Sequence, residues 1–540
     1  GRAFTAIALA AVLGACSSLP ARPPLPPTHA ITDYAATPLS AIAEHSLPGD
    51  TRSGFRLLPY GPNALAARVE LAALAVRSLD VQYYLLMADN TGLTLMRALR
   101  DAAARGVRVR LLVDDLYTSG EDDVLLALAS LPNVEVRLFN PFPGGRGAWL
   151  TRFMASAWEF HRVDRRMHNK LFVADNAAAI AGGRNMADAY VMNAPGSNFI
   201  DMDVLAIGPV VRDLSSAFDR YWNSEMVFPV QSIAFTPLSV SELRARLDRR
   251  IDAARPPETA DPDAEGNLTV LPDYPLQVPP EVATMLRVHS DLARHDLGPL
   301  LAANARVLVD PPEKRGQDGK LLEADIDHAP RAIGGTVTEG VIRWLLGAQQ
   351  SVRMVSPYFV PSANALVYLE RARKAGLEVV VVTNSLASTD EPLAYAEYAR
   401  NTRAMLAMGI ELYELSPSLS VKRRKLGLFG KRSGALHLKD AVRDDSQVFL
   451  GSMNLDPRSA WLNTEIGLII ESTEMARQLA SLRDPDSEYR LRLSADGSRV
   501  EWVGLDAEGN EAVYDAPPET SRWLRFKLWL LAPLIPRDEL

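Results

Sequence analysis

Two long stretches of the chain repeat the same order of apolar and polar segments. In the first, a run rich in β-branched and aromatic residues at 78–84 precedes a segment with apolar residues at helical spacing, 92–105. A strand-like run at 107–113, a helical segment at 125–131 and a strand-like run at 134–139 complete the series. Strands that alternate with helices of this length are typical of α/β folds with parallel pairing.

The second stretch repeats this series in the C-terminal half. Its strand-like runs lie at 351–356, 377–383 and 410–415, and its helical segments at 363–375 and 404–408. A repeat this long indicates a duplicated domain rather than a solenoid. We therefore predict an α/β fold of two pseudo-symmetric lobes, each a mostly parallel mixed sheet flanked by helices.

The segments outside the repeats differ in composition from the lobes. Residues 19–27 are rich in proline and predict an extended tether, and residues 256–265, rich in proline and acids, predict a connector without an assigned role. The predicted organisation is a signal segment at 1–16, a tether at 17–45, a first lobe at 46–245, a connector at 246–330, a second lobe at 331–485, and a C-terminal hairpin with a candidate interfacial helix at 486–540.

The one cysteine, Cys16, ends a short apolar run. Residues 4–14 are too short to cross a bilayer comfortably, and Leu13-Gly14-Ala15-Cys16 resembles a bacterial lipobox, in which the cysteine receives lipid. We predict lipidation of Cys16, with an uncleaved membrane anchor as the alternative. Ser17, the residue after the cysteine, resembles the residue found there in lipoproteins that are sorted to the outer membrane. We therefore expect the protein in the bacterial envelope, at the outer membrane facing the periplasm. Anchoring at the inner membrane is the alternative.

Each predicted lobe ends in the same polar motif. The first copy is His168-Asn169-Lys170, then Asp175; the second is His437-Leu438-Lys439, then Asp444, with four residues between Lys and Asp in both. Residues two apart in a strand point the same way, so each His and Lys share a face. Asp175 and Asp444 stand in turn sequences between two short apolar strands.

Small residues and an amide follow each turn at the same distance. Gly182-Gly183-Arg184-Asn185 ends the first motif, and Gly451-Ser452-Met453-Asn454 ends the second. Small residues let the backbone approach a phosphate closely. Asn185 and Asn454 would present side-chain amides beside it.

This double motif is identified as that of the phospholipase D superfamily, which implies one active site shared between the lobes. In this family one histidine attacks phosphorus and forms a covalent phosphohistidine, while the other protonates the leaving oxygen and later deprotonates the acceptor. The resemblance makes His168 the nucleophile and His437 the acid, although the sequence does not rank them. It implies that no cofactor or metal is needed. The residues that would stabilise charge on the phosphate are Lys170, Lys439, Asn185, Asn454 and Ser452.

The resemblance also implies carboxylates that orient the histidines. Glu465 and Asp203 stand at the places where family members hydrogen-bond a catalytic histidine. Asp175 and Asp444 are interpreted as holding the turn, with a direct chemical role as the alternative.

The sequences around the motifs narrow the resemblance. Asn454-Leu455-Asp456-Pro457-Arg458-Ser459 and Asn463-Thr464-Glu465 closely resemble bacterial cardiolipin synthases. The first motif, with residues 80–84 and 111–115, resembles the cardiolipin synthase C branch. The lipobox is not part of that resemblance.

Two further segments favour a phospholipid membrane as partner, with an anionic lipid such as phosphatidylglycerol. Lys422-Arg423-Arg424-Lys425, near Phe429, suits an anionic surface, with an ordinary solvated loop as the alternative. Residues 523–535 mix tryptophan and phenylalanine with basic residues, which predicts an interfacial helix or a helix packed on the second lobe. The net charge of −8 and the lack of an aromatic stacking platform argue against nucleic acid as partner.

The expected function is a phosphatidyltransferase that makes cardiolipin from phospholipids. The alternatives are a phospholipase D that gives phosphatidic acid, a nuclease, and a non-catalytic lipid-binding lipoprotein. The same residues serve transfer and hydrolysis, because the outcome depends on the access of water to the intermediate.

Overall fold

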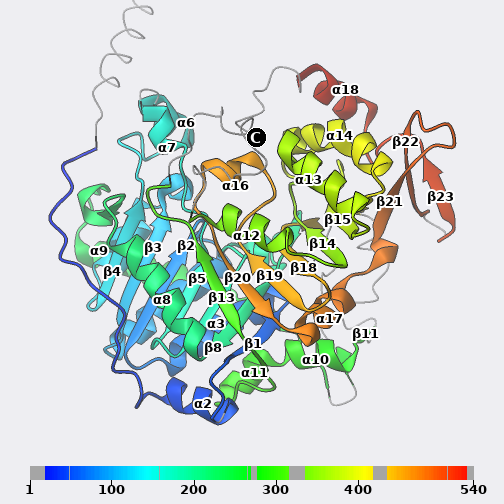
Figure 1. Cartoon of the computed structure of the whole chain (residues 1–540). Coiled ribbons are helices and arrows are strands. Elements are labelled where there is room, and N and C mark those ends of the chain that lie inside the picture. Colours follow the sequence, from blue (N-terminus) through cyan, green and yellow to red (C-terminus); the bar gives the residue numbers. More distant parts are fainter. Residues whose placement is uncertain are drawn as a thin grey trace, which may run out of the picture.

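Two large sheets with helices around them make up the protein (Figure 1). A computed structural model describes residues 19–47, 49–156, 159–263, 266–268, 276–314, 335–417, 434–506 and 509–531. Cys16 and the basic segment at 422–432 lie outside the described residues. The predicted α/β class with two lobes is confirmed.

The first lobe is built on one mixed sheet. Its strands, in spatial order, are β12 (Leu301–Ala303), β1 (Ser53–Leu58), β8 (Asp203–Ile207), β6 (Ala178–Gly182), β5 (Leu171–Ala174), β2 (Ser78–Tyr83), β3 (Arg108–Asp114), β4 (Val134–Phe139) and β9 (Val227–Pro229). Its helices are α2 (Pro38–Ser46), α3 (Gly61–Leu74), α4 (Asn90–Ala104), α5 (Asp122–Ala129), α6 (Trp149–Ala155), α7 (Phe160–Val163), α8 (Pro209–Trp222) and α9 (Val240–Ala253).

The second lobe repeats this order. Its strands are β13 (Ala305–Val309), β20 (Ile466–Glu471), β19 (Gln447–Gly451), β18 (Asp440–Arg443), β14 (Ser351–Val355), β15 (Glu378–Asn384), β16 (Glu411–Leu415), β21 (Glu488–Leu493), β22 (Val500–Leu505) and β23 (Glu511–Tyr514). Its helices are α12 (Val337–Leu345), α13 (Ala363–Lys374), α14 (Pro392–Ala407), α16 (Pro457–Trp461), α17 (Thr473–Leu482) and α18 (Arg522–Leu531). From β1 to β9 and from β13 to β21 the strand orders correspond, which confirms the duplication.

The sheets are mixed, but the prediction that they are mostly parallel was wrong. Among the described strands of these two large sheets, only the ladders β2–β3–β4 and β14–β15–β16 are parallel. The other strand pairs in both sheets are antiparallel, because the motif strands form the hairpins β5–β6 and β18–β19 and the next strand returns beside them. The strands that alternate with helices in the sequence form only the parallel part of each sheet.

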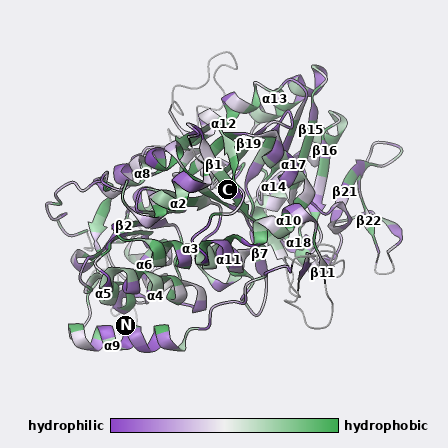
Figure 2. Cartoon of the chain, turned by 90° about the horizontal axis from the view of Figure 1, so that it is seen from below, coloured by the Kyte–Doolittle hydropathy of each residue, from purple (hydrophilic) through white to green (hydrophobic). Residues whose placement is uncertain are grey.

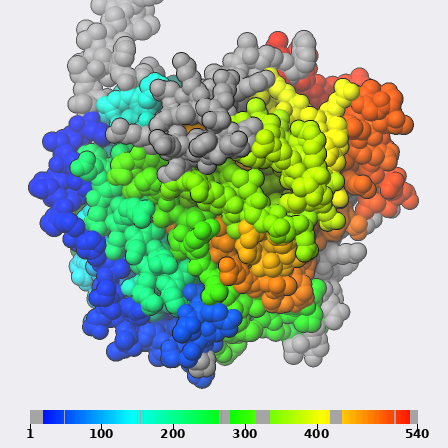
Figure 3. Space-filling model, in the orientation of Figure 1, coloured from blue at the N-terminus to red at the C-terminus, as the bar shows by residue number. Residues whose placement is uncertain are grey.

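One buried cluster of side chains joins the lobes. It contains Val173 and Leu214 of the first lobe together with Val448 and Leu468 of the second. In the space-filling view the first lobe, blue to blue-green, lies against the second, bright green to orange (Figure 3). The relative position of the lobes is therefore fixed by a common core.

The structure gives most of the predicted connector to one lobe or the other. Leu243, Leu247 and Ile251 of α9 pack in the first-lobe core, while the rest of that helix is largely hydrophilic (Figure 2). The short strands β10 (Asn267–Leu268) and β11 (Leu276–Gln277) and the helices α10 (Pro280–Leu286) and α11 (Val288–Ala293) follow. The chain then adds β12 to the first sheet and, after Asn304, β13 to the second.

Both ends of the described chain pack on the lobes. In the predicted tether, Arg22 donates to Val227 O at 2.9 Å and Ala30 N donates to Asp219 at 2.8 Å. At the other end, Leu528 of α18 packs in the second-lobe core. In the part of the chain that is described, no helix has the length and apolar character needed to span a membrane.

Candidate active site

Each catalytic-motif histidine lies beside a segment of the opposite lobe. Met167 forms a parallel bridge to Thr464, and His168 N donates to Thr464 O at 2.9 Å. In the symmetric place, β17 (Gly434–Leu436) pairs in parallel with β7 (Asn198–Ile200), directly before His437. Both motifs therefore end at the junction of the lobes.

This arrangement crosses the histidine–carboxylate pairs. His168 Nδ1 lies 2.9 Å from Glu465 Oε2 of the second lobe, and His437 Nδ1 lies 2.6 Å from Asp201 Oδ2 of the first. All four side chains are buried. A carboxylate on Nδ1 fixes the tautomer and leaves Nε2 of each ring as the nitrogen for substrate.

The carboxylate that meets His437 is Asp201, so the prediction of Asp203 was wrong. Gly182 pairs with Asp203 and the equivalent Gly451 pairs with Gly467, which makes Asp201 the counterpart of Glu465. Asp203 instead forms ion pairs with Arg68 at 2.9 Å and Arg184 at 3.1 Å. Side chains two residues apart in a strand point to the same face of the sheet. Strand periodicity alone therefore could not distinguish Asp201 from Asp203.

Both lysines lie where the motif predicted them. Lys170 Nζ donates to His168 O at 2.6 Å, and Lys439 Nζ lies 2.9 Å from His437 Nδ1 and also donates to His437 O. Each lysine is 1% exposed. The structure thus holds two lysine side chains in the buried centre beside the histidines.

The side chains of both asparagines have unused hydrogen-bonding capacity. Asn185 and Asn454 are buried, and within the described residues neither Oδ1 atom has a hydrogen-bond partner. Buried polar atoms in this state are costly unless another group meets them.

The Ser452 hydroxyl contacts the carboxylate that meets His168. It donates to Glu465 Oε2 at 2.5 Å and accepts from Ile466 N at 3.0 Å. Its single proton is therefore used by the His168–Glu465 pair. A role of Ser452 at the phosphate stays a prediction.

Asp175 and Asp444 hold the turns behind the site. Asp175 accepts from the main-chain N–H groups of Val76, Arg77 and Ser78. Asp444 accepts in the same way from residues 349–351. Both have left-handed φ values, 51° and 52°, that favour Asp or Asn in such turns. Their geometry supports the structural interpretation.

Burial sets the charge of the site. Burial lowers the pKa of His168 to about 4, against the opposing effect of Glu465, and lowers the pKa of Lys439 to about 8. Burial and the two lysines hold the pKa of His437 well below its ordinary value. Burial also lowers the pKa of Lys170 well below its ordinary value. An anionic ligand in this centre would raise all these pKa values again.

The pKa values of the two carboxylates are shifted in opposite directions. Burial raises the pKa of Asp201, whereas for Glu465 the contacts with His168, Lys170 and Ser452 outweigh burial and lower the pKa. Glu465 is thus the more firmly ionised partner.

Aromatic rings line both histidines. Tyr84 meets the His168 ring edge-on at 4.8 Å between centroids, and Lys170 Nζ lies 5.1 Å from the Tyr84 centroid. Around His437 the rings are Tyr190, at 5.0 Å, and Phe199, at 5.2 Å. These rings limit the directions from which solvent reaches the histidines.

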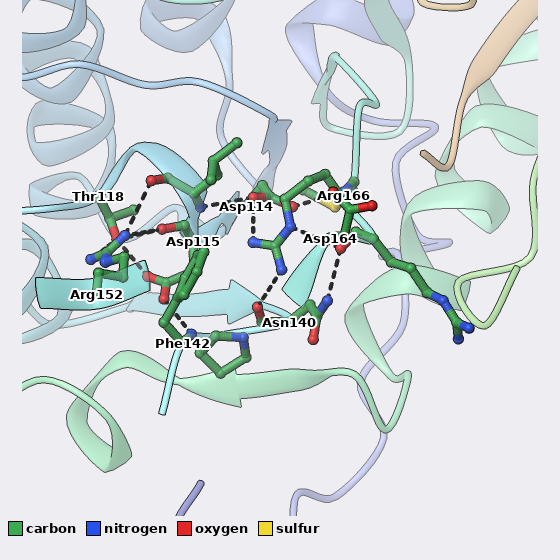
Figure 4. A network of polar contacts seen from close by, with 12 residues as sticks. Asp114, Asp115, Thr118, Asn140, Phe142, Arg152, Asp164 and Arg166 are labelled. Carbon is green, nitrogen blue, oxygen red and sulfur yellow. Dashed lines mark hydrogen bonds and ion pairs between the residues drawn. The ribbon is translucent and has the colours of Figure 1, made fainter. Parts of the chain in front are cut away.

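A buried ionic network fixes the segment before His168 (Figure 4). Asp114 accepts from Met167 N at 2.7 Å and from Arg166 at 3.0 Å, and Arg166 also donates to Asn140 O at 2.9 Å. The neighbouring Asp115 accepts from Phe142 N at 2.8 Å. Such a network gives the histidine backbone one position.

A second support, absent from the sequence analysis, holds Glu465. Asp310 accepts from Glu465 N at 2.9 Å and donates its own N–H to Glu465 O at 3.0 Å. Lys314 pairs with Asp310 at 2.8 Å and donates to Ser459 O and Asn463 O. No motif marks either residue, since they lie just after β13 in the predicted connector. Across the described ranges, three or more His, Cys, Asp or Glu side chains nowhere gather as a metal site would require.

Two duplicated lobes that bring one His–Lys pair each to a common buried centre define an enzyme of the phospholipase D class. Sequence comparison gives the family: the model of the "Cardiolipin synthase, PLD-like domain" matches residues 69–222 and 341–483, more than half of the chain. The chain belongs to this family.

Individual relatives agree with this assignment. The chain is 37% identical to cardiolipin synthase C of Escherichia coli (strain K12) over 480 residues. The matched region covers 88% of this chain and 93% of that protein. It is 30% identical over 531 residues to an uncharacterized protein of Helicobacter pylori (strain ATCC 700392 / 26695), covering 97% of both. The crystal structure of phosphatidylserine synthase from Haemophilus influenzae Rd KW20 shares the fold, with a TM-score of 0.53 and 13% identity over 91% of this chain and 97% of that one.

Proposed function

We propose that the protein is a phosphatidyltransferase that makes cardiolipin through a phosphohistidine intermediate. The observation that carries the proposal is the crossed pair of His–carboxylate contacts with two buried lysines between the lobes. The match to cardiolipin synthase C over most of both chains supports phospholipid as the substrate class.

The first step uses both histidines. His168 Nε2 attacks the phosphorus of a donor phospholipid, and the bond from phosphorus to the leaving alkoxide oxygen breaks. His437 gives its Nε2 proton to that oxygen. His437 must be protonated for this. Burial and the lysines hold its pKa low, and the negative phosphodiester supplies the charge that raises it.

The second step reverses these roles. Neutral His437 takes the proton of a phosphatidylglycerol hydroxyl, whose oxygen attacks phosphorus, and the bond from phosphorus to His168 Nε2 breaks. Water in place of that hydroxyl would give phosphatidic acid, which is the hydrolase alternative.

The unequal carboxylates support His168 as the nucleophile. A phosphorylated imidazole carries positive charge, and an ionised carboxylate on Nδ1 stabilises it. Glu465, with its lowered pKa, suits that role better than Asp201, whose pKa is raised.

The other groups serve the phosphate itself. The ammonium groups of Lys170 and Lys439 and the amides of Asn185 and Asn454 lie in the same buried centre. They would stabilise charge on the non-bridging oxygens, where it grows in the transition state.

For its place in the cell, we extend the prediction of a lipid anchor at Cys16. The proposed place is the bacterial envelope, at the outer membrane facing the periplasm. The proposed partner is a membrane that contains an anionic lipid such as phosphatidylglycerol.

The test is a product analysis by mass spectrometry, with purified protein and vesicles of phosphatidylglycerol and phosphatidylethanolamine. We expect cardiolipin from the wild type, none from His168→Ala or His437→Ala, and wild-type levels from the control His45→Ala on the exposed end of α2. Phosphatidic acid alone would establish the hydrolase. Turnover that persists in both active-site variants would contradict the proposal, and digestion of DNA without lipid turnover would favour a nuclease.

A further inference from the structure

Several helices at one end of the molecule carry exposed apolar side chains. Figure 1 places α6, α7, α16 and α18 at this end, and α6–α7, in cyan, and α18, in red, reach the surface there in the space-filling view (Figure 3). The exposed fractions are 64% for Leu150, 46% for Phe160, 61% for Trp523 and 53% for Leu530. Large apolar side chains exposed together on several elements mark an interaction surface.

Helix α18 has two unlike faces. Leu528 is buried, and Leu524 packs beside it on the second-lobe core. Trp523 and Leu530 face outward, and Lys527 Nζ lies 5.2 Å from the Trp523 ring centroid. A helix that is packed through one face and presents aromatic and basic side chains on the other has the pattern of an interfacial helix.

On the first lobe, the exposed side chains connect to the catalytic centre. Tyr117 is 42% exposed, and its ring meets Tyr84 at 5.3 Å, which in turn meets His168 at 4.8 Å. Helix α7, which carries Phe160, ends at Asp164, and Asp164 pairs with Arg458 of α16 at 2.9 Å. The elements that expose Leu150 and Phe160 therefore also build the surroundings of the site.

We propose that α6, α7 and the outer face of α18 form a docking face for an anionic phospholipid bilayer. The inference rests on the proposed function, because the phosphorus of a membrane phospholipid lies at headgroup depth and the site must reach it there. The four apolar side chains enter the interface, while the exposed Arg522 and Lys527 meet headgroup phosphates. The basic side chains beside exposed aromatic ones match an anionic lipid surface in charge and in polarity.

The test measures vesicle binding of the full chain with Cys16→Ser, so that no acyl anchor contributes. The two docking variants are Trp523→Ser/Leu530→Ser and Leu150→Ser/Phe160→Ser. The control is Phe235→Ser, since Phe235 is 86% exposed on the loop between η4 (Val230–Ser232) and α9. With phosphatidylglycerol–phosphatidylethanolamine vesicles we expect each docking variant to bind about tenfold more weakly or worse, and the control to bind like the parent chain.

Two further arms separate the docking face from the chemistry. On dispersed short-chain phosphatidylglycerol the docking variants keep the turnover of the parent chain, whereas His168→Ala loses turnover yet binds vesicles normally. Loss of vesicle binding in the docking variants without turnover in any sample would uphold the face and overturn the proposed function. Unchanged vesicle binding in both variants would overturn the face, as would equal binding of the parent chain to vesicles of phosphatidylcholine alone. A change in molar mass by light scattering, with vesicle binding intact, would assign the face to a second copy of the chain.

Discussion

The two lobes hold equivalent carboxylates by different means. In the second lobe, Asp310 binds both main-chain groups of Glu465, and Lys314 neutralises Asp310. In the first lobe, Arg184 donates to Asp201 O at 2.5 Å and pairs with Asp203 at 3.1 Å. A cation thus stands behind each carboxylate, but it comes from a different part of the chain.

The contacts of the carboxylate groups differ too. Ser452 donates to Glu465, while the equivalent residue of the first lobe is Gly183, which offers no hydroxyl. A Cβ atom on Gly183 would clash with Asp201 Oδ1, so a larger residue there would force the Asp201 side chain to move. Duplication kept the backbone and the His–Lys geometry, and the supports diverged. This inequality suits the proposed mechanism, in which one histidine is the nucleophile and the other is the acid.

The largest expected effect comes from neutralising the carboxylates. We expect Glu465→Gln to lower kcat on the order of 10³- to 10⁴-fold, because the ring of His168 loses its orienting charge. Asp201→Asn should lower kcat less, because burial raises the pKa of Asp201 and makes it the less firmly ionised of the two carboxylates. Steady-state lipid turnover checks the order, and a greater loss for Asp201→Asn would reverse the assignment of the two roles.

Removal of the cation behind Glu465 should mainly affect stability. Lys314→Met leaves the charge of Asp310 buried without its ion-pair partner, and we expect it to lower the free energy of unfolding by about 3–5 kcal/mol. The double variant Asp310→Asn/Lys314→Met should recover part of this loss, because neither charge remains. Urea denaturation measures both, and additive losses in the double variant would show that the ion pair is not what stabilises this segment.

Giving Gly183 of the first lobe the serine found at the equivalent position of the second should have a moderate effect on stability and turnover. Gly183→Ser forces the Cβ atom against Asp201, and we expect a loss of about 1–3 kcal/mol in stability together with lower turnover. Gly147→Ser, in exposed chain with nothing near its Cβ position, is the matched control. Wild-type stability and turnover for Gly183→Ser would refute the close approach of Asp201.

The smallest effect concerns pH. The Ser452 hydroxyl stabilises the ionised form of Glu465, so Ser452→Ala should raise the pKa of Glu465. The acidic limb of the kcat/KM profile should then move to higher pH, with a loss of about tenfold at its midpoint. A profile that keeps its acidic limb while falling uniformly would indicate that Ser452 meets the substrate instead.

The sequence predicted the parts that follow from local spacing. The His–Lys pairs, the turn aspartates and the βαβ strands of each lobe appear as predicted, because strand and helix periods are local properties. The crossed partners are long-range: His168 and Glu465 stand 297 residues apart, and only the pairing of the lobes brings them together. The choice between Asp201 and Asp203 depended on strand register, and Lys314 lies in a segment without any pattern. The sequence predicted the turns at Asp175 and Asp444 between short strands. Such turns imply antiparallel hairpins, which the prediction of mostly parallel sheets did not take into account.

The most direct test of the crossed, unequal pairs is to locate the covalent intermediate. The protein is mixed briefly with phosphatidylglycerol, quenched in base to preserve phosphohistidine, digested, and mapped by mass spectrometry. We predict a phosphatidyl adduct on the peptide that contains His168, reduced by Glu465→Gln and unaffected by the control His45→Ala. An adduct on the peptide that contains His437 would contradict the account.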